Sequence, residues 1–468
     1  MVLRFADSTT AIIIIGISRS FSRARCVRQF VYPHATGKIL LNVLLMYLVP
    51  LAVLLVAAGA VEERRAARAA TVALVVFALV MLLYGAVGFG FQFGGIGLVN
   101  DAPGLKALVR EWSPFDTTLG LGWGIVGLDA FGINFLFINA DLTNLYLYHA
   151  ALAATAVFMP ALALAARVRS RVIVIGAALL GMFVYPLAAN WVWGGGWLQQ
   201  FGLTSALGHG MVDLAGSGVV YLFGGMATLG ALLGYGVRSH TRVATAANSP
   251  EFPSAHLPLL MILGAFLFLI GAGVVVFGDP FPVADLPIPQ IQLNLLNAAM
   301  AGLVVATLYG WFVSGEPLAM LAARGAVAGV VAVSASLPFI PAWAALVIGG
   351  VAGLLLPLTT YAVERWIRAD DRALLVPTFG VAGIWGLLAL AIFADGTYGD
   401  GWNKTGIGRH LGVTGQGVSG IFVQTGFVPD SPGQMEAQFF GVVAIGLLAF
   451  LSAFLIFFVL RRIGGAPE

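Results

Sequence analysis

Charged side chains are scarce in this sequence of 468 residues. It has 24 Lys and Arg and 21 Asp and Glu, about 10% of the chain, whereas 60% of its residues are hydrophobic. A soluble domain carries about 25% charged residues, and so few charges cannot cover a soluble surface of this size. The composition therefore excludes soluble, disordered and nucleic-acid-binding proteins, and the small net charge of +3 points to no polyanion-binding patch. We predict an all-α polytopic membrane protein.

Cysteine and histidine are also scarce. The one cysteine, Cys26, excludes a disulfide framework and a Cys-rich metal site. The sequence has no HExxH motif, and Gly194-Gly195-Gly196 is followed by Trp197 rather than lysine, so it is no phosphate loop. We therefore predict no enzyme, no cofactor and no metal site. The six histidines are scattered along the chain: His34, His149, His209, His240, His256 and His410.

Long apolar runs are abundant. A helix that crosses a bilayer needs about 20 mostly apolar residues, and eleven stretches meet this requirement. Two segments rich in Gly, Asp, Asn and Trp, 96–142 and 395–436, interrupt them, and we expect both to form ordered loops on one face. The predicted spans are 39–60, 71–95, 143–166, 172–193, 214–236, 257–277, 290–313, 318–336, 341–363, 376–394 and 437–460.

Basic residues predict the orientation of these spans, because cytoplasmic loops are enriched in Lys and Arg. Arginines follow the first, third, fifth, ninth and eleventh spans, so the odd spans end in the cytoplasm. This places the N-terminus outside and the C-terminus inside. The arginines concerned are Arg64, Arg65, Arg68, Arg167, Arg169, Arg171, Arg238, Arg242, Arg365, Arg368, Arg372, Arg461 and Arg462.

Residues 1–37 disagree with this orientation, because their arginines would lie outside. Their apolar run, 11–16, is too short to span a membrane, and the arginines follow it, whereas a secretory signal has its basic residues first. Two interpretations are open: a poorly ordered or mis-annotated extension, and an atypical targeting segment.

An internal repeat predicts two inverted halves. Asp213 opens the fifth span from the outside and Asp371 opens the tenth from the inside, and Tyr221 and Phe379 each follow eight residues later. Inverted repeats place a transport site near the midplane of the bilayer. At 1.5 Å per residue, eight residues put both aromatic rings roughly 12 Å inside their faces of the membrane.

Several motifs, taken in order, resemble the Amt/Mep/Rh ammonium transporter family. Residues 190–198, NWVWGGGWL, precede 213–225, DLAGSGVVYLFGG, as a WGGG-type turn precedes the D-F-A-G-[SG]-x-V-V-H helix start of the family. Three further stretches agree: GEPL at 315–318 leading to 324–332, GGVAG at 349–353, and Asp370-Asp371 leading to 380–386. The resemblance covers about residues 38–463.

This resemblance implies a function and an assembly. We expect a transmembrane transporter or channel for ammonium or ammonia in the cell membrane, a homotrimer with one narrow pore per subunit. The transmembrane domain, 38–463, would comprise halves at 39–236 and 257–394 and a last helix at 437–460. The expected partners are the small-molecule substrate, the lipid bilayer and a cytoplasmic regulatory protein, with no nucleic acid.

The resemblance also implies a substrate pathway. Trp193 matches the family's tryptophan at the outer mouth, where an aromatic face can offset part of a cation's dehydration by about 0.5–2 kcal/mol; the other interpretation is an interfacial aromatic belt. Phe268 falls at one phenylalanine of the family's gate, and Leu152 at the other. Ala272 stands where many members have a serine. The gate is therefore expected to be hydrophobic but thinner.

Four polar residues each allow two interpretations. We expect Asp213 and Asp371 to cap helices near the pore, and Asp213 alternatively to add negative potential at a cation entry site. His149, inside the third span, is a functional candidate or a packed histidine. Arg324 snorkels to the cytoplasm or pairs structurally with an aspartate, or else it plugs or lines the inner mouth.

The central departure from the family concerns two pore histidines that touch each other. Tyr221 and Phe379 occupy their positions. Tyr221 keeps a hydroxyl, but with a pKa near 10 for free tyrosine it is a poor proton carrier, and Phe379 offers only a ring face. Three hypotheses follow: transport of ammonium or ammonia as net neutral NH3, passage of another small neutral solute such as CO2 or methylamine, and a closed pore that acts as a sensor or interaction protein.

Overall fold

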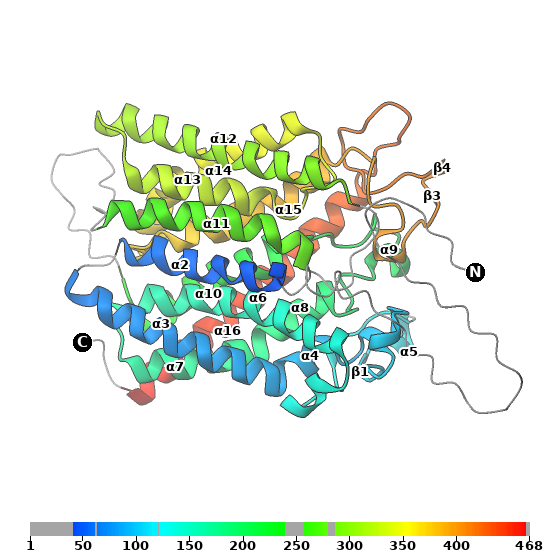
Figure 1. Ribbon diagram of the computed structural model, residues 1–468, viewed down its shortest axis with the longest axis horizontal. Coiled ribbons are helices and arrows are strands. Elements are labelled where there is room, and N and C mark those ends of the chain that lie inside the picture. Colours follow the sequence, from blue (N-terminus) through cyan, green and yellow to red (C-terminus); the bar gives the residue numbers. More distant parts are fainter. Residues whose placement is uncertain (1–40, 61–62, 120, 239–256, 279–285, 465–468) are drawn as a thin grey trace, which may run out of the picture.

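The computed structural model describes residues 41–60, 63–119, 121–238, 257–278 and 286–464. The predicted N-terminal extension, 1–37, lies outside the described residues. The rest forms a helical bundle whose long helices run side by side (Figure 1). Within the bundle α10 packs along α16, and α12 packs against both α13 and α14.

Long helices and π-helical segments build the bundle. Several predicted spans contain a π-helical turn that is continuous with an α-helix. The elements are α2 (Leu48–Ala58), α3 (Glu63–Leu83), η1 (Tyr84–Gly88), α4 (Phe89–Phe93), α6 (Ala140–Ala165), α7 (Ser170–Leu179), η5 (Leu180–Val184), α8 (Tyr185–Trp193), η6 (Ser217–Leu222), α10 (Phe223–Tyr235), α11 (Pro258–Gly278), α12 (Ile288–Ser314), α13 (Ala319–Val333), α14 (Ala342–Ala362), η7 (Val363–Ile367), η8 (Val376–Val381), α15 (Ala382–Phe393) and α16 (Gly433–Gly464).

Short elements fill the segments between the long helices. β1 pairs antiparallel with β2, and β3 with β4. These elements are η2 (Ile96–Leu98), η3 (Pro103–Leu105), β1 (Glu111–Trp112), α5 (Asp116–Leu119), β2 (Val126–Gly127), η4 (Ile133–Phe137), α9 (Phe201–Thr204), η9 (Trp402–Lys404), β3 (Arg409–His410) and β4 (Val413–Thr414).

The predicted spans coincide with helices in the structure. Within the described residues, ten helices are long and apolar enough to cross a membrane. The remaining predicted span, 318–336, coincides with α13, which is apolar but has only 15 residues. The chain is therefore a multi-pass helical membrane protein.

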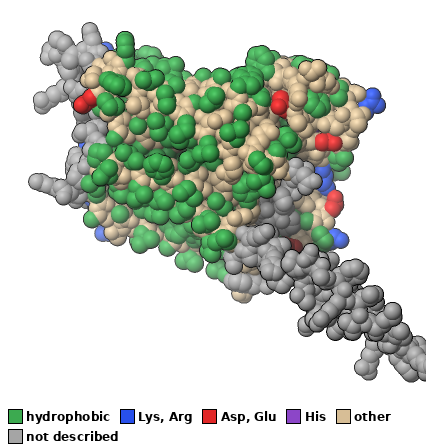
Figure 2. Space-filling model, turned by 45° about the horizontal axis from the view of Figure 1, so that its top comes forward, with side chains coloured by type: hydrophobic (Ala, Val, Ile, Leu, Met, Phe, Trp, Pro, Cys, Tyr) green, Lys and Arg blue, Asp and Glu red, His purple; other side chains and the backbone are tan. Residues whose placement is uncertain are grey.

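The outer face of the bundle is apolar. Hydrophobic side chains cover most of the face seen in Figure 2, and the few charged ones lie near the ends of the molecule. α12 illustrates the pattern, because most of its exposed apolar residues are three or four positions apart. Its exposed apolar residues include Ile288, Leu293, Leu296, Met300, Val304, Leu308, Trp311 and Phe312. Such a large apolar surface is typical of contact with lipid.

The two long polar loops lie at the same end of the bundle, as the sequence predicts. In Figure 1, β1 and α5 of the first loop and β3 and β4 of the second all lie at the right-hand end. An ion pair joins the loops, since Lys404 Nζ lies 2.8 Å from Asp101 Oδ2. Segments about 300 residues apart in the chain thus build one surface.

Two π-helical segments, η6 and η8, pack against each other inside the bundle. Each continues into an α-helix, α10 and α15. Each also crosses the α-helix that follows the other, with no side chains between the backbones. A Cβ atom on Gly225 of α10 would overlap the backbone of Gly380 in η8, and one on Gly383 of α15 would overlap the carbonyl oxygen of Ser217 in η6. Glycine is required at such a crossing because any other residue would force the helices apart.

Candidate functional site

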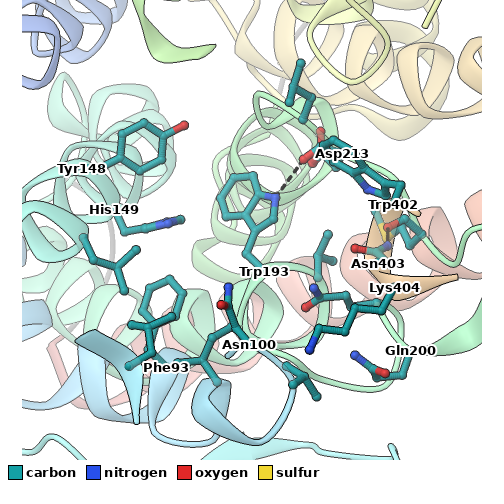
Figure 3. Close-up of a pocket in the computed structure, with 18 of the residues that line it drawn as sticks. Phe93, Asn100, Tyr148, His149, Trp193, Gln200, Asp213, Trp402, Asn403 and Lys404 are labelled. Atoms are coloured by element: carbon teal, nitrogen blue, oxygen red, sulfur yellow. Dashed lines mark hydrogen bonds between the residues drawn. The ribbon is translucent and has the colours of Figure 1, made fainter. Parts of the chain in front are cut away.

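A cavity of about 270 Å³ opens at the loop end of the bundle. Side chains from α6, α8 and both polar loops converge on it. In Figure 3, Phe93, Tyr148 and His149 lie on one side of Trp193, and Asp213, Asn403 and Lys404 lie on the other, next to Trp402. Its lining includes Phe93, Asn100, Tyr148, His149, Trp193, Gln200, Asp213, Trp402, Asn403 and Lys404. Few polar groups within an aromatic lining are typical of sites for small ligands.

Trp193 and Asp213 are held together at this cavity. Trp193 is the last residue of α8, and its indole Nε1 donates a 2.8 Å hydrogen bond to the carbonyl oxygen of Asp213 (Figure 3). The Asp213 carboxylate in turn accepts hydrogen bonds of 2.9–3.0 Å from the backbone N–H groups of Gly216, Gly218 and Val219. These are N–H groups that the first turn of a helix leaves without partners. The geometry is that of a helix cap.

We expect Asp213→Ala to lower the free energy of unfolding by about 2–4 kcal/mol, because three buried N–H groups lose their acceptor. Asp213→Asn keeps one acceptor oxygen, so its effect should be smaller. Thermal unfolding in detergent measures the difference, with Glu436→Ala, an exposed acidic residue of α16, as the control. Equal unfolding temperatures for Asp213→Ala and the wild type would contradict the cap.

His149 lies on α6 at the end of a hydrogen-bond chain. The Tyr84 hydroxyl donates to Gln92 Oε1 at 2.7 Å, and Gln92 Nε2 lies 3.2 Å from His149 Nδ1. Because an amide nitrogen can only donate, Nδ1 accepts, and the neutral imidazole carries its proton on Nε2. The ring lies 5.3 Å from that of Trp193 and points toward it (Figure 3). Neither Gln92 nor Tyr84 was singled out by sequence analysis.

Beyond the cavity, three aromatic rings form a buried cluster. Tyr221, Phe268 and Phe379 are at most 1% exposed, and their ring centroids lie 5.6–6.0 Å apart. Tyr221 comes from η6, Phe268 from α11 and Phe379 from η8. Leu152, on α6, is buried and lies outside the lining of the cavity, as do the three rings. The structure thus brings together the residues that the sequence repeat relates.

Asp371, just before η8, and Arg324, inside α13, are both buried. Asp371 Oδ2 accepts a 2.7 Å hydrogen bond from the Val376 N–H at the start of η8, which is a cap like that of Asp213. Arg324 is fully buried and donates from Nη2 to the Val56 carbonyl oxygen at 3.2 Å. The snorkelling conformation considered from the sequence is therefore wrong. Asp370, one of the two aspartates considered as partners of Arg324, forms an ion pair with Arg167 instead: its Oδ2 lies 2.9 Å from Arg167 Nη1.

The polar side of the cavity was only coarsely visible in the sequence. The composition of the two loops predicted a shared face, but not that Gln200 and Asn403 would line a cavity. Asn403 donates from Nδ2 to the carbonyl oxygens of His209 and Met211 at 2.9 and 3.2 Å, and so joins the second loop to the segment before η6. Loop residues of this kind carry no periodic signal.

Comparison with known proteins identifies relatives along most of the chain. Residues 38–466 match the sequence model of the Ammonium Transporter Family. The ammonium transporter Amt2 of Archaeoglobus fulgidus is 32% identical over 288 residues, which cover 61% of this chain and 61% of Amt2. Amt1 of the same organism is 28% identical over 332 residues, 68% of this chain and 79% of Amt1. The chain thus spans about three fifths of the length of Amt2.

Solved structures share the fold. A protein titled Sensor Amt Protein superposes with a TM-score of 0.73 at 22% identity and covers 93% of this chain and 94% of its own. Mep2 of Candida albicans gives a TM-score of 0.69 at 19% identity, with 92% of this chain and 84% of Mep2 covered. Together with the match over 38–466, the ordered motifs and the helical bundle lead to one conclusion: the chain belongs to the ammonium transporter family.

Proposed function

We propose that this protein conducts ammonia across the cell membrane and that the net transported species is neutral NH3. The observation that carries this proposal is the arrangement of the cavity and the three buried rings beyond it. The caps formed by Asp213 and Asp371 hold the helices that carry two of these rings. Family membership supplies the substrate class. The rings supply the reason for excluding the charged form.

The cavity suits the capture and deprotonation of ammonium. The faces of Trp193 and Tyr148 can offset part of the cation's dehydration, by about 0.5–2 kcal/mol. Once a proton has left for the outer solution, NH3 has a lone pair that can accept a hydrogen bond from Nε2–H of His149. NH4+ has no lone pair, so the tautomer fixed by Gln92 favours the neutral molecule.

The ring cluster then acts as an apolar passage. An unpaired polar group in an apolar environment costs roughly 2–7 kcal/mol, and an isolated charge costs far more. Small NH3 can cross beside Tyr221, Phe268 and Phe379 when the rings rotate, whereas NH4+ meets no compensating charge there. Leu152 extends the apolar passage on α6. Arg324 stands on the opposite half of the pathway and adds a barrier to cations at the inner end.

The proposal includes a topology and an assembly. We place eleven spans in the membrane, with the N-terminus outside and the C-terminus inside, as two inverted five-helix halves and a last helix. The arginines that follow the odd spans support this orientation, and the equivalent caps at Asp213 and Asp371 support the inverted halves. The assembly proposed is a homotrimer, and its cytoplasmic face is where a regulatory protein would bind.

A second candidate function is a non-conducting ammonium sensor. The observation that favours it is the burial of the three rings at 0–1% exposure, which leaves the passage closed in this conformation. A channel for another small neutral solute, such as CO2 or methylamine, rests on the same rings. These candidates differ from NH3 conduction in what crosses the membrane.

Flux and current measured together separate these functions. Proteoliposomes receive an inward ammonium gradient, and internal pH and transient current are recorded, with protein-free liposomes as the control. We expect internal alkalinisation without current. A robust ammonium-dependent current would contradict neutral transport, and silence in both signals would favour the sensor. The same vesicles tested with methylamine or CO2 identify a different solute.

A further inference from the structure

Two histidines that are far apart in the sequence meet at the loop end of the bundle. His209 lies between α9 and η6, and His410 lies in β3; their ring centroids are 4.2 Å apart. Figure 1 shows α9 and β3 at the same end of the molecule. Asp430 completes the group, because its Oδ2 lies 2.9 Å from Nε2 of His410. The histidines are scattered along the sequence, and the fold brings these two together.

The three side chains can direct ligand atoms to one point. One ring nitrogen of each histidine and one carboxylate oxygen of Asp430 all lie within 4.8 Å of one another. A tetrahedral zinc ion with bonds of about 2.0–2.2 Å holds its ligand atoms roughly 3.3 Å apart. To admit the ion, the separation of 2.9 Å between His410 and Asp430 widens by a few tenths of an ångström, and the widest separation in the group, at most 4.8 Å, closes toward about 3.3 Å.

His209 is the second, independent observation. Its side chain is fully buried, and neither ring nitrogen has a hydrogen-bond partner in the described part of the chain. Burial of polar groups without partners costs about 1–3 kcal/mol by mutational measures. A neutral imidazole keeps a lone pair on one ring nitrogen, as a metal ligand must.

The surrounding backbone holds these side chains in place. The His209 N–H donates to Gln434 Oε1 at 3.0 Å, and its carbonyl oxygen accepts from Asn403. The His410 ring lies against Gly406, where a Cβ atom would come within 2.7 Å of Nδ1. Gly406 also has a φ of +66°, which favours glycine. The ring therefore has little freedom to turn away from Asp430.

We propose that His209, His410 and Asp430 bind a divalent transition-metal ion of the zinc class. Two imidazoles and one carboxylate match the ligand preference of zinc and its neighbours and not that of calcium or magnesium. The partly exposed side of His410 and Asp430, at 11% and 7% side-chain exposure, leaves a fourth position for water. This site is distinct from the substrate pathway, and the sequence predicted no metal.

Such an ion would join the segment between α9 and η6 to the second long loop. His209 precedes η6, whereas His410 and Asp430 belong to the long loop that also carries Asn403 of the cavity. An ion bound only in the folded state stabilises the protein in proportion to the logarithm of its concentration. Metal binding should therefore raise the unfolding temperature and order the loop that carries Asn403 of the cavity.

Metal binding to the purified full-length protein tests the proposal, after removal of any histidine tag and treatment with a chelator. Titration calorimetry with zinc chloride, followed by elemental analysis after dialysis, should give one zinc ion per chain. Asp430→Asn preserves size and a hydrogen-bond acceptor, and we expect it to weaken binding by about tenfold or more. His209→Ala should do the same. Glu436→Gln, an exposed carboxylate nearby, should bind like the wild type.

A gain in signal complements these losses. With His209→Cys, cobalt(II) should show an intense thiolate-to-metal charge-transfer band that the wild type lacks, because a thiolate has replaced an imidazole in the coordination shell. Zinc uptake that is equal in the wild type, Asp430→Asn and His209→Ala would mean an adventitious ion only and would overturn the proposal. So would the absence of uptake by the wild type. Neither outcome bears on NH3 conduction, which needs no metal.

Discussion

Replacing Tyr221 and Phe379 together with histidine should create an ammonium-dependent current that the wild-type protein lacks. The two rings are buried, 5.9 Å apart between centroids, and inclined by only 29°. Two imidazoles at these positions supply adjacent donors and acceptors with a pKa near neutrality. A proton that leaves NH4+ at the outer cavity could then follow the substrate inward. The net transported species would change from NH3 to NH4+.

The measurement is a transient current on proteoliposomes, together with internal pH. Tyr221→His alone leaves Phe379 as a gap in the proton path, so it should give flux with little current. Tyr221→Phe removes the hydroxyl and should conduct no proton at all. A folded double variant without current would place the barrier elsewhere, at Phe268 or at Arg324. Tyr221→His thus tests whether both imidazoles are needed, and Tyr221→Phe, like the wild type, is the control without current.

Gly225→Ala should abolish most of the folded protein, although alanine is the better helix former. In an exposed helix this change gains roughly 0.5–1 kcal/mol. Here the new methyl group would overlap the backbone nitrogen and Cα of Gly380. Backbone atoms cannot turn aside as a side chain can, so η8 and α10 must separate. We expect a loss of about 3 kcal/mol or more.

Gly446→Ala is the matched control. Gly446 is likewise buried in a long helix, but a Cβ there meets only side-chain atoms of Leu222 and Met226 at 3.9 Å. This variant should unfold at the same temperature as the wild type or slightly higher. Size-exclusion chromatography and thermal unfolding in detergent report both variants. A stable, monodisperse Gly225→Ala protein would contradict the close crossing of the backbones.

Sequence reasoning predicted the fold well, because bilayer thickness imposes a single strong pattern on every span. It also placed Asp213 and Asp371 at helix starts, since a carboxylate before an apolar run has few other roles. The spacing of Tyr221 and Phe379 placed both rings at a similar depth, and the structure shows them 5.9 Å apart. Each of these features depends on local sequence or on one repeat.

What sequence reasoning could not reach depends on contacts between distant segments. His209 and His410 are unremarkable singly, and only the packing of two loops brings them within 4.2 Å. The hydrogen-bond acceptor of Arg324 is the carbonyl oxygen of Val56, which no side-chain pattern can indicate. Gln92 fixes the tautomer of His149, but it lies in the apolar helix α4, where the sequence gives no sign of this role. Polar groups in loops and apolar helices follow no period.

The crossing of η6 and η8 limits how the molecule can move while it works. The same holds where the helices continue: with backbones in direct contact at Gly225 of α10 and Gly380 of η8, these two elements have no layer of side chains on which to slide. A rocking cycle of the kind found in alternating-access carriers would have to break this contact at every turnover. Rotation of individual rings needs no such rearrangement and is far faster than movement of domains. Permeation should therefore depend only weakly on temperature and show no slow reorientation step.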